Sequence, residues 1–295
     1  MNVGIEKKWI YLIALSLIWG SSFILIKKSL LGLSPLQVGS LRIVFSSIII
    51  FLIAFNRIKN IPKNKWKWVS LSAIIGTFFP AFLFAYAETQ IDSAVASILN
   101  SLVPMNTVLI GFAVFKISTT KTQSFGVLIG FIGTCTLIIS GADLNPDQNY
   151  LYSGFVIICS VLYAINVNLI KKYLFDVNAV SIAAGQFVVI FIPSIIVLFY
   201  SGFFNLEFTD NDLLYDSLIY VLLLSFFGTA MAKILFNRLI QISSPVFASS
   251  VTYSMLIVSV IWGVLDGELF NFHQAVATIL IIIGVYLSNK KKPIN

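Results

Sequence analysis

Charged side chains are scarce in this sequence. They make up 11% of the 295 residues, whereas hydrophobic residues make up 58%. Soluble globular proteins average about 25% charged residues. A chain of this length cannot enclose so much apolar surface in a core surrounded by water. The composition therefore excludes an ordinary soluble protein and predicts a chain embedded in lipid.

Histidine and cysteine are also nearly absent. His273 is the only histidine, and the two cysteines, Cys135 and Cys159, lie inside apolar runs. A metal centre needs clustered histidine, cysteine or carboxylate ligands, and no such spacing occurs. The sequence also lacks a Walker phosphate-binding loop. We therefore expect no metal, no cofactor, no disulfide and no catalytic group.

Carboxylates are missing from the middle of every apolar run. Asp92, Asp266 and Glu268 lie only at the ends of such runs. A buried aspartate or glutamate commonly carries the proton in pumps and transporters. The sequence therefore offers no visible carrier for proton coupling.

Long apolar runs, in contrast, fill the chain. A membrane-spanning helix needs about 20 mainly apolar residues. The runs predict ten such helices, at residues 9–29, 35–55, 67–87, 92–115, 122–141, 152–171, 178–201, 215–239, 244–265 and 271–289. The connections between them are short. The expected fold class is all-α, a polytopic membrane protein with ten transmembrane helices and no soluble domain.

The basic residues fall on one side of such a bundle. If the helices alternate in direction, most of the 19 lysines and arginines lie at the ends that share a side with both termini, and most of the 12 acidic residues lie opposite. Basic loops stay in the cytoplasm. We therefore expect both termini to be cytoplasmic, and we assign the positive charge to the membrane surface rather than to nucleic acid.

The chain also repeats itself. The run Leu25–Ile26–Lys27–Lys28 returns as Leu169–Ile170–Lys171–Lys172, Trp19 corresponds to Tyr163, and Arg42 corresponds to Gln186. Two repeats are predicted, residues 1–147 and 148–295, with five helices each. An odd number of helices inserts the two halves in opposite directions. Inverted repeats are typical of secondary transporters, which bind substrate near the middle of the membrane between the halves.

Arg42 is the clearest ionisable residue inside a predicted span, and such residues are usually functional. It can anchor a carboxylate or another anion, or it can reach outward and cap carbonyls. Lys27 lies near the outer end of its helix and is expected to pair with an outer carboxylate such as Glu88 or Asp92. That pairing would be structural.

Polar stripes run along several predicted spans. Ser225, Thr229, Lys233 and Asn237 follow at steps of four and therefore share one helix face. Similar faces on residues 92–115 and 244–265 favour a polar cavity shared by both halves, although hydroxyls and amides also join helices without any other role. For Lys233, outward snorkelling remains an alternative. The Gly126–Gly130 pair fits either a dimer face or an internal contact.

Four segments carry a resemblance to a known family. They are WGSSFILIK (19–27), PLQVGSLR (35–42), DSAVASILNSLVPMNTVLIGFAVF (92–115), and the Gly267–Glu268 pair followed by Gln274 and Gly284. Together they resemble the drug/metabolite transporter superfamily, EamA-like branch, over essentially the whole chain. One departure is Phe115–Lys116–Ile117, where the family usually has a Gly-Glu pair.

The resemblance implies export or exchange of small metabolites, often amino acids, across the inner membrane. It also implies a ten-helix basket whose cavity is lined mainly by helices 1, 3, 4, 6, 8 and 9, while helices 5 and 10 pack away from it. Arg42, on helix 2, is not at the centre of such a basket. This implies a gating or structural role for it.

We therefore predict a secondary transporter of small metabolites, foremost amino acids or related zwitterions, that works by alternating access in the inner (plasma) membrane. An intramembrane enzyme of lipid or isoprenoid metabolism is the alternative. The expected partners are a small-molecule substrate and the lipid bilayer, and a second copy of the chain is a candidate partner. The candidate substrate-binding residues are Trp19, Ser22, Arg42, Tyr86, Asn100, Pro104, Tyr163, Asn166, Gln186, Lys233 and Tyr253. Trp19, Asn100, Tyr163 and Tyr253 are expected to line one cavity, and Ile281 to face lipid.

The topology can be tested with single cysteines at Asn64 and Asn211. Asn64 lies in a basic connection and Asn211 in an acidic one, so basic-residue bias places them on opposite sides of the membrane. On intact cells, an impermeant thiol reagent should label the cysteine at Asn211 and not the one at Asn64. Equal labelling of the two would contradict the ten-helix inverted repeat.

Overall fold

The computed structural model describes residues 3–115, 121–144, 147–207 and 211–288, and this part of the chain is helical with no strand. The helices of its first half are α1 (Val3–Ser29), α2 (Pro35–Ala54), α3 (Trp66–Ala73), the π-helical η3 (Ile74–Phe78), α4 (Phe79–Ala87), α5 (Ser93–Asn100), α6 (Val103–Phe115) and α7 (Lys121–Leu144). Those of the second half are α8 (Ser153–Tyr173), α9 (Ala179–Tyr200), α10 (Asp212–Leu223), the π-helical η6 (Leu224–Met231), α11 (Ala232–Ile242), α12 (Pro245–Ser249), α13 (Val251–Leu265) and α14 (Phe272–Ser288). Short 3₁₀ turns are η1 (Phe55–Asn60), η2 (Lys63–Lys65), η4 (Tyr150–Tyr152) and η5 (Phe203–Asn205).

Eight segments of the described chain are long and apolar enough to cross a membrane. They are Lys7–Ser29, Pro35–Asn60, Lys63–Ala87, Ser93–Val114, Tyr150–Tyr173, Ala179–Tyr200, Asp212–Ile242 and Pro245–Leu265. Two shorter apolar stretches, Leu128–Ser140 and Phe272–Leu287, lie at the predicted helices 5 and 10. The all-helical, polytopic membrane fold is thereby confirmed, and the count of ten crossings stays a prediction. Lys116, Ile117, Asp210 and residues 290–292 lie outside the described residues.

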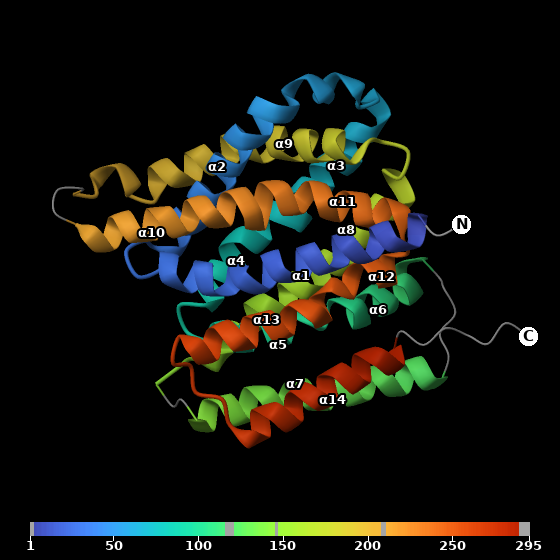
Figure 1. Ribbon diagram of the computed structural model, residues 1–295, viewed down its shortest axis with the longest axis vertical. Coiled ribbons are helices and arrows are strands. Elements are labelled where there is room, and N and C mark those ends of the chain that lie inside the picture. Colours follow the sequence, from blue (N-terminus) through green and yellow to red (C-terminus); the bar gives the residue numbers. More distant parts are fainter. Residues whose placement is uncertain (1–2, 116–120, 145–146, 208–210, 289–295) are drawn as a thin grey trace, which may run out of the picture.

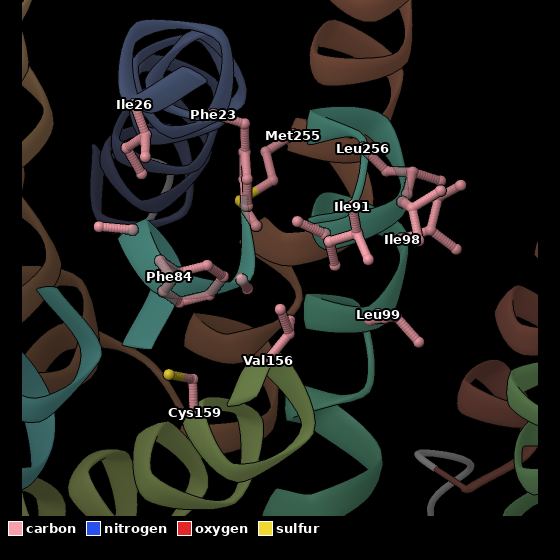
Figure 2. Packing of buried hydrophobic residues seen from close by; sticks show 14 of the residues in the cluster. Phe23, Ile26, Phe84, Ile91, Ile98, Leu99, Val156, Cys159, Met255 and Leu256 are labelled. Carbon is pink, nitrogen blue, oxygen red and sulfur yellow. The ribbon is translucent and has the colours of Figure 1, made fainter. Parts of the chain in front are cut away.

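The helices run roughly parallel or antiparallel in one bundle, and α1 begins at the same end at which α14 ends (Figure 1). Large apolar side chains cover the outside: Leu52, Leu151 and Phe272 are each more than three quarters exposed. Exposed apolar surface of this extent is expected where lipid is the solvent. Inside, Phe23 of α1 meets Phe84 of α4 edge to face, with the ring centroids 5.6 Å apart (Figure 2).

The start of α2 is set by its own sequence. Ser34 accepts a hydrogen bond from the Gln37 backbone, and the Gln37 side chain accepts one from the Ser34 backbone, which forms a capping box. Pro35 occupies the first turn, where its missing amide hydrogen costs nothing. Gln37 also donates to the Ser201 carbonyl and ties α2 to the end of α9. This fixed start sets the helical phase at which Arg42 follows, about two turns later.

Four of the predicted spans are irregular rather than continuous. The third and eighth contain π-helical segments, η3 and η6. The fourth breaks between α5 and α6, and the ninth breaks between α12 and α13. Pro104 explains one break, because it cannot donate to the carbonyl of Asn100. At the other break the hydroxyls of Ser249, Ser250 and Thr252 bond to nearby carbonyls and compete with the helical ladder.

α7 and α14 lie side by side along one flank of the bundle (Figure 1). A Cβ on Gly284 of α14 would overlap the backbone of Gly126 and Gly130 in α7. The Gly126–Gly130 pair is therefore an internal contact. The expectation that Ile281 faces lipid is wrong, because Ile281 is fully buried against Gly133 of α7. Both a lipid-facing and a helix-facing position take isoleucine, so hydrophobicity alone does not separate them.

This packing predicts that Gly284→Ala destabilises the protein, because the added methyl group has no space and overpacking costs about 1–3 kcal/mol. Gly154 in α8 has open space around its Cα, so Gly154→Ala is the matched control. Removing a helical glycine there should leave stability unchanged or raise it. Thermal unfolding of both purified variants in detergent measures the difference. A Gly284→Ala variant as stable as the Gly154→Ala variant would show that the two helices do not pack this closely.

Candidate functional site

A cavity lies inside the bundle between segments of both halves. Its volume is about 90 Å³. On the same measure one water molecule needs about 10–15 Å³, so the cavity has room for several waters or a small ligand. It is lined by Trp19, Ser22, Phe23, Ile26, Arg42, Gly76, Thr77, Ala81, Phe84, Asn100, Val103, Tyr163, Asn166, Gly228, Thr229, Lys233, Phe236, Ser249, Thr252 and Met255. These residues come from the predicted spans 1, 2, 3, 4, 6, 8 and 9, and the paired α7 and α14 contribute none of them.

Most of the residues predicted for the site lie in this wall. They are Trp19, Ser22, Arg42, Asn100, Tyr163, Asn166 and Lys233. The family resemblance implies that Arg42 lies away from the centre of the bundle. This is wrong, because α2 brings the Arg42 side chain to the cavity wall. The alternative that Lys233 snorkels outward is wrong. Only 7% of Lys233 is exposed, and its ammonium group donates a hydrogen bond to the Gly76 carbonyl in η3.

Among the described residues of the wall, Arg42 and Lys233 are the only ones with a basic or acidic side chain. The Arg42 Nε donates to the Thr229 hydroxyl at 2.7 Å, and the Lys233 Nζ donates to the Gly76 carbonyl at 2.6 Å. Both partners are neutral. Two basic side chains therefore share a cavity with no carboxylate among its described wall residues, and the other nitrogens of the Arg42 guanidinium group can donate to a bound anion.

Irregular backbone supplies the cavity with carbonyl acceptors. Pro80 has no amide hydrogen and cannot donate to Gly76, which leaves this carbonyl for Lys233. In η6 the Gly228 carbonyl accepts a hydrogen bond from the Trp19 indole nitrogen at 3.0 Å. Segments of π-helix often occur at functional sites. Here they lie in the third and eighth predicted spans, which correspond in the two repeats.

Aromatic rings and unpaired polar atoms complete the wall. Trp19 packs edge-on against Phe236 with the ring centroids 4.8 Å apart. The ring centroids of Tyr163 and Phe84 lie 6.2 Å apart. Within the described residues, the Asn100 Oδ1 and the Thr77 Oγ1 have no hydrogen-bond partner although both are buried. Buried polar atoms are normally satisfied, so these two are free to bind a ligand.

Gln186 lies behind the wall and does not line it. Its amide nitrogen donates to Ser72 at 2.6 Å, and Ser72 donates to the Asn166 side chain at 2.5 Å. The amide of Asn237 donates back to Gln186 at 3.3 Å. The chain of bonds holds Asn166 in place, so Gln186 positions a lining residue from α9.

Three further predicted residues do not line the cavity. Tyr253 packs against the hydrophobic core around Met255, and its neighbour Thr252 takes its place in the wall. Ser249, Thr252 and Met255 line the cavity at steps of three residues, and Tyr253 falls beside this face. Tyr86 is half-buried near Phe155. Pro104 is buried at the start of α6, where it shapes the backbone instead.

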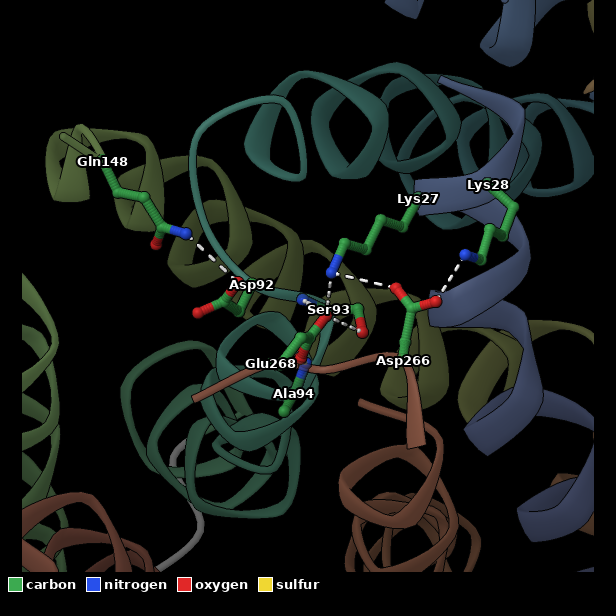
Figure 3. A network of polar contacts seen from close by, with 8 residues as sticks. All are labelled: Lys27, Lys28, Asp92, Ser93, Ala94, Gln148, Asp266 and Glu268. Atoms are coloured by element: carbon green, nitrogen blue, oxygen red, sulfur yellow. Dashed lines mark hydrogen bonds and ion pairs between the residues drawn. The ribbon is translucent and has the colours of Figure 1, made fainter. Parts of the chain in front are cut away.

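A network of charges closes the bundle at one end, here called the Glu268 end (Figure 3). Glu268 accepts hydrogen bonds from the Ser93 backbone at 2.9 Å, the Ser93 hydroxyl at 2.6 Å and the Ala94 backbone at 3.0 Å. It thereby caps α5 from the other half of the chain. Gly267, with φ of 87°, forms the turn that brings Glu268 back toward α13.

Lys27 joins α1 to this network. Its ammonium group lies 2.8 Å from Glu268 and 3.2 Å from Asp266, and Asp266 also pairs with Lys28. The expected pairing of Lys27 with a carboxylate at this end of the bundle is therefore confirmed, and its partners are Glu268 and Asp266 rather than Glu88 or Asp92. Burial alone would raise the pKa of Asp266, but hydrogen bonds from Lys28 and Lys27 hold it below its usual value. Sequence reasoning identified Glu268 only through its Gly-Glu motif, because its partners are far away in the chain.

The comparisons with known proteins agree with this architecture. An uncharacterized transporter of Archaeoglobus fulgidus is 25% identical over 97% of this chain and all of its own length. The uncharacterized inner membrane transporter YedA of Escherichia coli is 26% identical over 94% of this chain and 88% of its own. A Chlamydia muridarum protein named as an S-adenosylmethionine/S-adenosylhomocysteine transporter is 23% identical over 97% and 93%.

A solved crystal structure shares the fold, with a TM-score of 0.66 and 15% identity over 96% of both chains. The model of the EamA-like transporter family matches residues 7–139 and again residues 151–290. The two matches cover both halves of the cavity wall. The chain belongs to the EamA-like transporter family and is a polytopic membrane protein of the transporter type.

Proposed function

We propose that this protein carries small zwitterionic metabolites, amino acids foremost, across the cytoplasmic membrane by alternating access of the central cavity, with both termini in the cytoplasm. The observation that carries the proposal is the pair of basic side chains in the cavity wall, Arg42 and Lys233, with no carboxylate among the described wall residues. A charge inside a membrane protein is costly and is typically kept for a ligand or an ion pathway.

The chemistry of Arg42 suits a carboxylate. A guanidinium group presents several donors in a planar fork that matches two carboxylate oxygens. Thr229 occupies the Nε position and orients the fork, while Lys233 adds a second positive charge. The carboxylate of an amino acid would supply the anion that the wall lacks.

Neutral groups of the wall suit the remaining parts of an amino acid. The faces of Trp19 and Tyr163 attract an ammonium group, and the unpaired Asn100 Oδ1 can accept a hydrogen bond from it. Phe23, Phe84 and Met255 provide apolar contact for a side chain. Pockets for small molecules generally combine apolar walls with a few such polar groups.

One relative supports the same class of substrate. The Chlamydia muridarum protein is named as a transporter of S-adenosylmethionine and S-adenosylhomocysteine. Both molecules contain an α-amino acid group with its carboxylate. A carboxylate bound by Arg42 would be common to them and to free amino acids.

Interrupted helices suit alternating access. In transporters built from inverted repeats, discontinuous helices at the repeat interface bind substrate while the halves move about it. The breaks between α5 and α6 and between α12 and α13 lie at Asn100 and Ser249, and both side chains line the cavity. We propose that the two repeats are inverted and that these breaks mark where the halves move.

Counterflow in proteoliposomes tests the function. Vesicles loaded with unlabelled L-amino acids should take up labelled amino acids faster with the protein than without it, and S-adenosylmethionine serves as a second probe. Absence of protein-dependent uptake for every common amino acid and for S-adenosylmethionine would contradict the proposed substrate class.

Arg42 provides the sharpest variant for this assay. Arg42→Ala should reduce counterflow at least about tenfold, because loss of a hydrogen bond to a charged group costs about 1.5–3 kcal/mol. Arg42→Lys should lose less, since it keeps the charge and loses only the fork. Arg57→Ala, at an exposed arginine of η1, is the matched control. Normal counterflow by a properly inserted Arg42→Ala protein would show that the guanidinium group does not bind substrate.

A further inference from the structure

Gly76 is surrounded by three side chains that can donate hydrogen bonds into the cavity. The Lys233 Nζ donates to the Gly76 carbonyl at 2.6 Å. Thr77 follows Gly76 in the chain, and its buried hydroxyl has no hydrogen-bond partner among the described residues. The Asn166 amide lies so close to Gly76 that a Cβ there would overlap it. All three side chains line the cavity, and Thr77, Asn166 and Lys233 are here called the Gly76 subsite.

A chain of hydrogen bonds fixes the direction of the Asn166 amide. The amide of Asn237 donates to Gln186, and the amide of Gln186 donates to Ser72. The Ser72 hydroxyl in turn donates its hydrogen to the Asn166 Oδ1. With its oxygen held by Ser72, the Asn166 side chain presents its amide nitrogen, which is a donor, toward Gly76. The hydrogen bonds behind the wall therefore make Asn166 a donor of the subsite.

This subsite is distinct from the guanidinium fork of Arg42. Arg42 extends from α2 and bonds to Thr229 in η6, whereas the Gly76 subsite is formed by residues of η3, α8 and α11. Lys233 follows Thr229 by four residues, so the two positions lie one helical turn apart, which is about 5 Å along the axis. Arg42 and Lys233 also interact electrostatically. The cavity therefore offers two anion-binding positions within the reach of one small molecule.

A neutral amino acid leaves one of these two positions empty. Its carboxylate would bind Arg42, and its ammonium group would donate to the Asn100 Oδ1, an unpaired acceptor in the wall. Nothing in such a molecule pairs with Lys233, which has no carboxylate among the described wall residues. Aspartate and glutamate carry a second carboxylate a few carbon–carbon bonds from the first. That carboxylate would fill the Gly76 subsite and favour the charged form of Lys233, because a nearby opposite charge favours ionisation.

We propose that the Gly76 subsite binds the side-chain carboxylate of acidic amino acids, so that the transporter prefers aspartate and glutamate to asparagine and glutamine. The inference rests on the proposed function and narrows its substrate class. A side-chain amide has nearly the same shape as a carboxylate, but it carries no charge and turns its own donors toward the donors of the subsite. Hydrogen bonds to charged groups are worth about 1.5–3 kcal/mol, so the preference should reach at least about tenfold.

Competition during counterflow tests the preference. Proteoliposomes loaded with L-glutamate should take up labelled L-glutamate. Unlabelled glutamate or aspartate outside should inhibit this uptake at concentrations at least about ten times lower than glutamine or asparagine. Equal inhibition by glutamine and glutamate would overturn the inference and leave the transport function standing, as would counterflow of neutral amino acids without any counterflow of glutamate. Absence of counterflow for every amino acid and for S-adenosylmethionine would contradict the proposed function and this inference with it.

Variants of the subsite test which residues cause the preference. Lys233→Met keeps an unbranched side chain and removes the charge, so it should lose most of the discrimination between glutamate and glutamine while counterflow of glutamine persists through Arg42. Thr77→Val keeps the shape, removes the hydroxyl and should lower the discrimination several-fold. Lys67→Met, at an exposed lysine of α3, is the matched control and should discriminate as the wild type does. Undiminished preference for glutamate in Lys233→Met, or in Thr77→Val if Lys233→Met does not insert, would overturn the inference.

Discussion

The interior of this bundle holds two basic side chains where the surroundings are largely apolar, and much of the architecture serves to keep them there. Arg42 and Lys233 each bond to a neutral oxygen across the cavity, from Thr229 in η6 and Gly76 in η3. Neither oxygen neutralises a charge. A buried cation without a counter-ion is costly, so the cavity favours any ligand that brings an anion. This imbalance is the physical basis for assigning a carboxylate-bearing substrate.

Matching irregularities in the two halves make that site possible. The π-helical segments η3 and η6 and the two broken spans occur in corresponding predicted helices, and they turn backbone carbonyls and small polar side chains toward the cavity. Regular helices would satisfy those carbonyls internally. At the Glu268 end the carboxylates of Glu268 and Asp266 hold Lys27, which joins α1 to α5 and to the α13–α14 connection.

Sequence reasoning predicted the membrane fold and much of the cavity because both depend on composition and local periodicity. Arg42 and Lys233 stand out as charges in apolar runs, and Trp19 and Tyr163 correspond in the repeat. Sequence reasoning failed where contacts between distant segments determine which way a side chain points. The Glu268 partner of Lys27 lies 241 residues away. Thr252 lines the cavity and Tyr253 does not. Ile281 faces α7 instead of lipid.

The central claim is that the cavity binds the transported molecule, and a thermal-shift screen of the purified protein tests it most directly. A ligand that binds only the folded state raises the melting temperature in proportion to ln(1 + [L]/Kd). At least one amino acid or related zwitterion should stabilise the wild type. The shift should shrink in Trp19→Ala and Asn100→Ala and persist in Ile279→Ala, which changes an exposed residue of α14. Equal shifts in all three variants, or no stabilising zwitterion at all, would contradict the account.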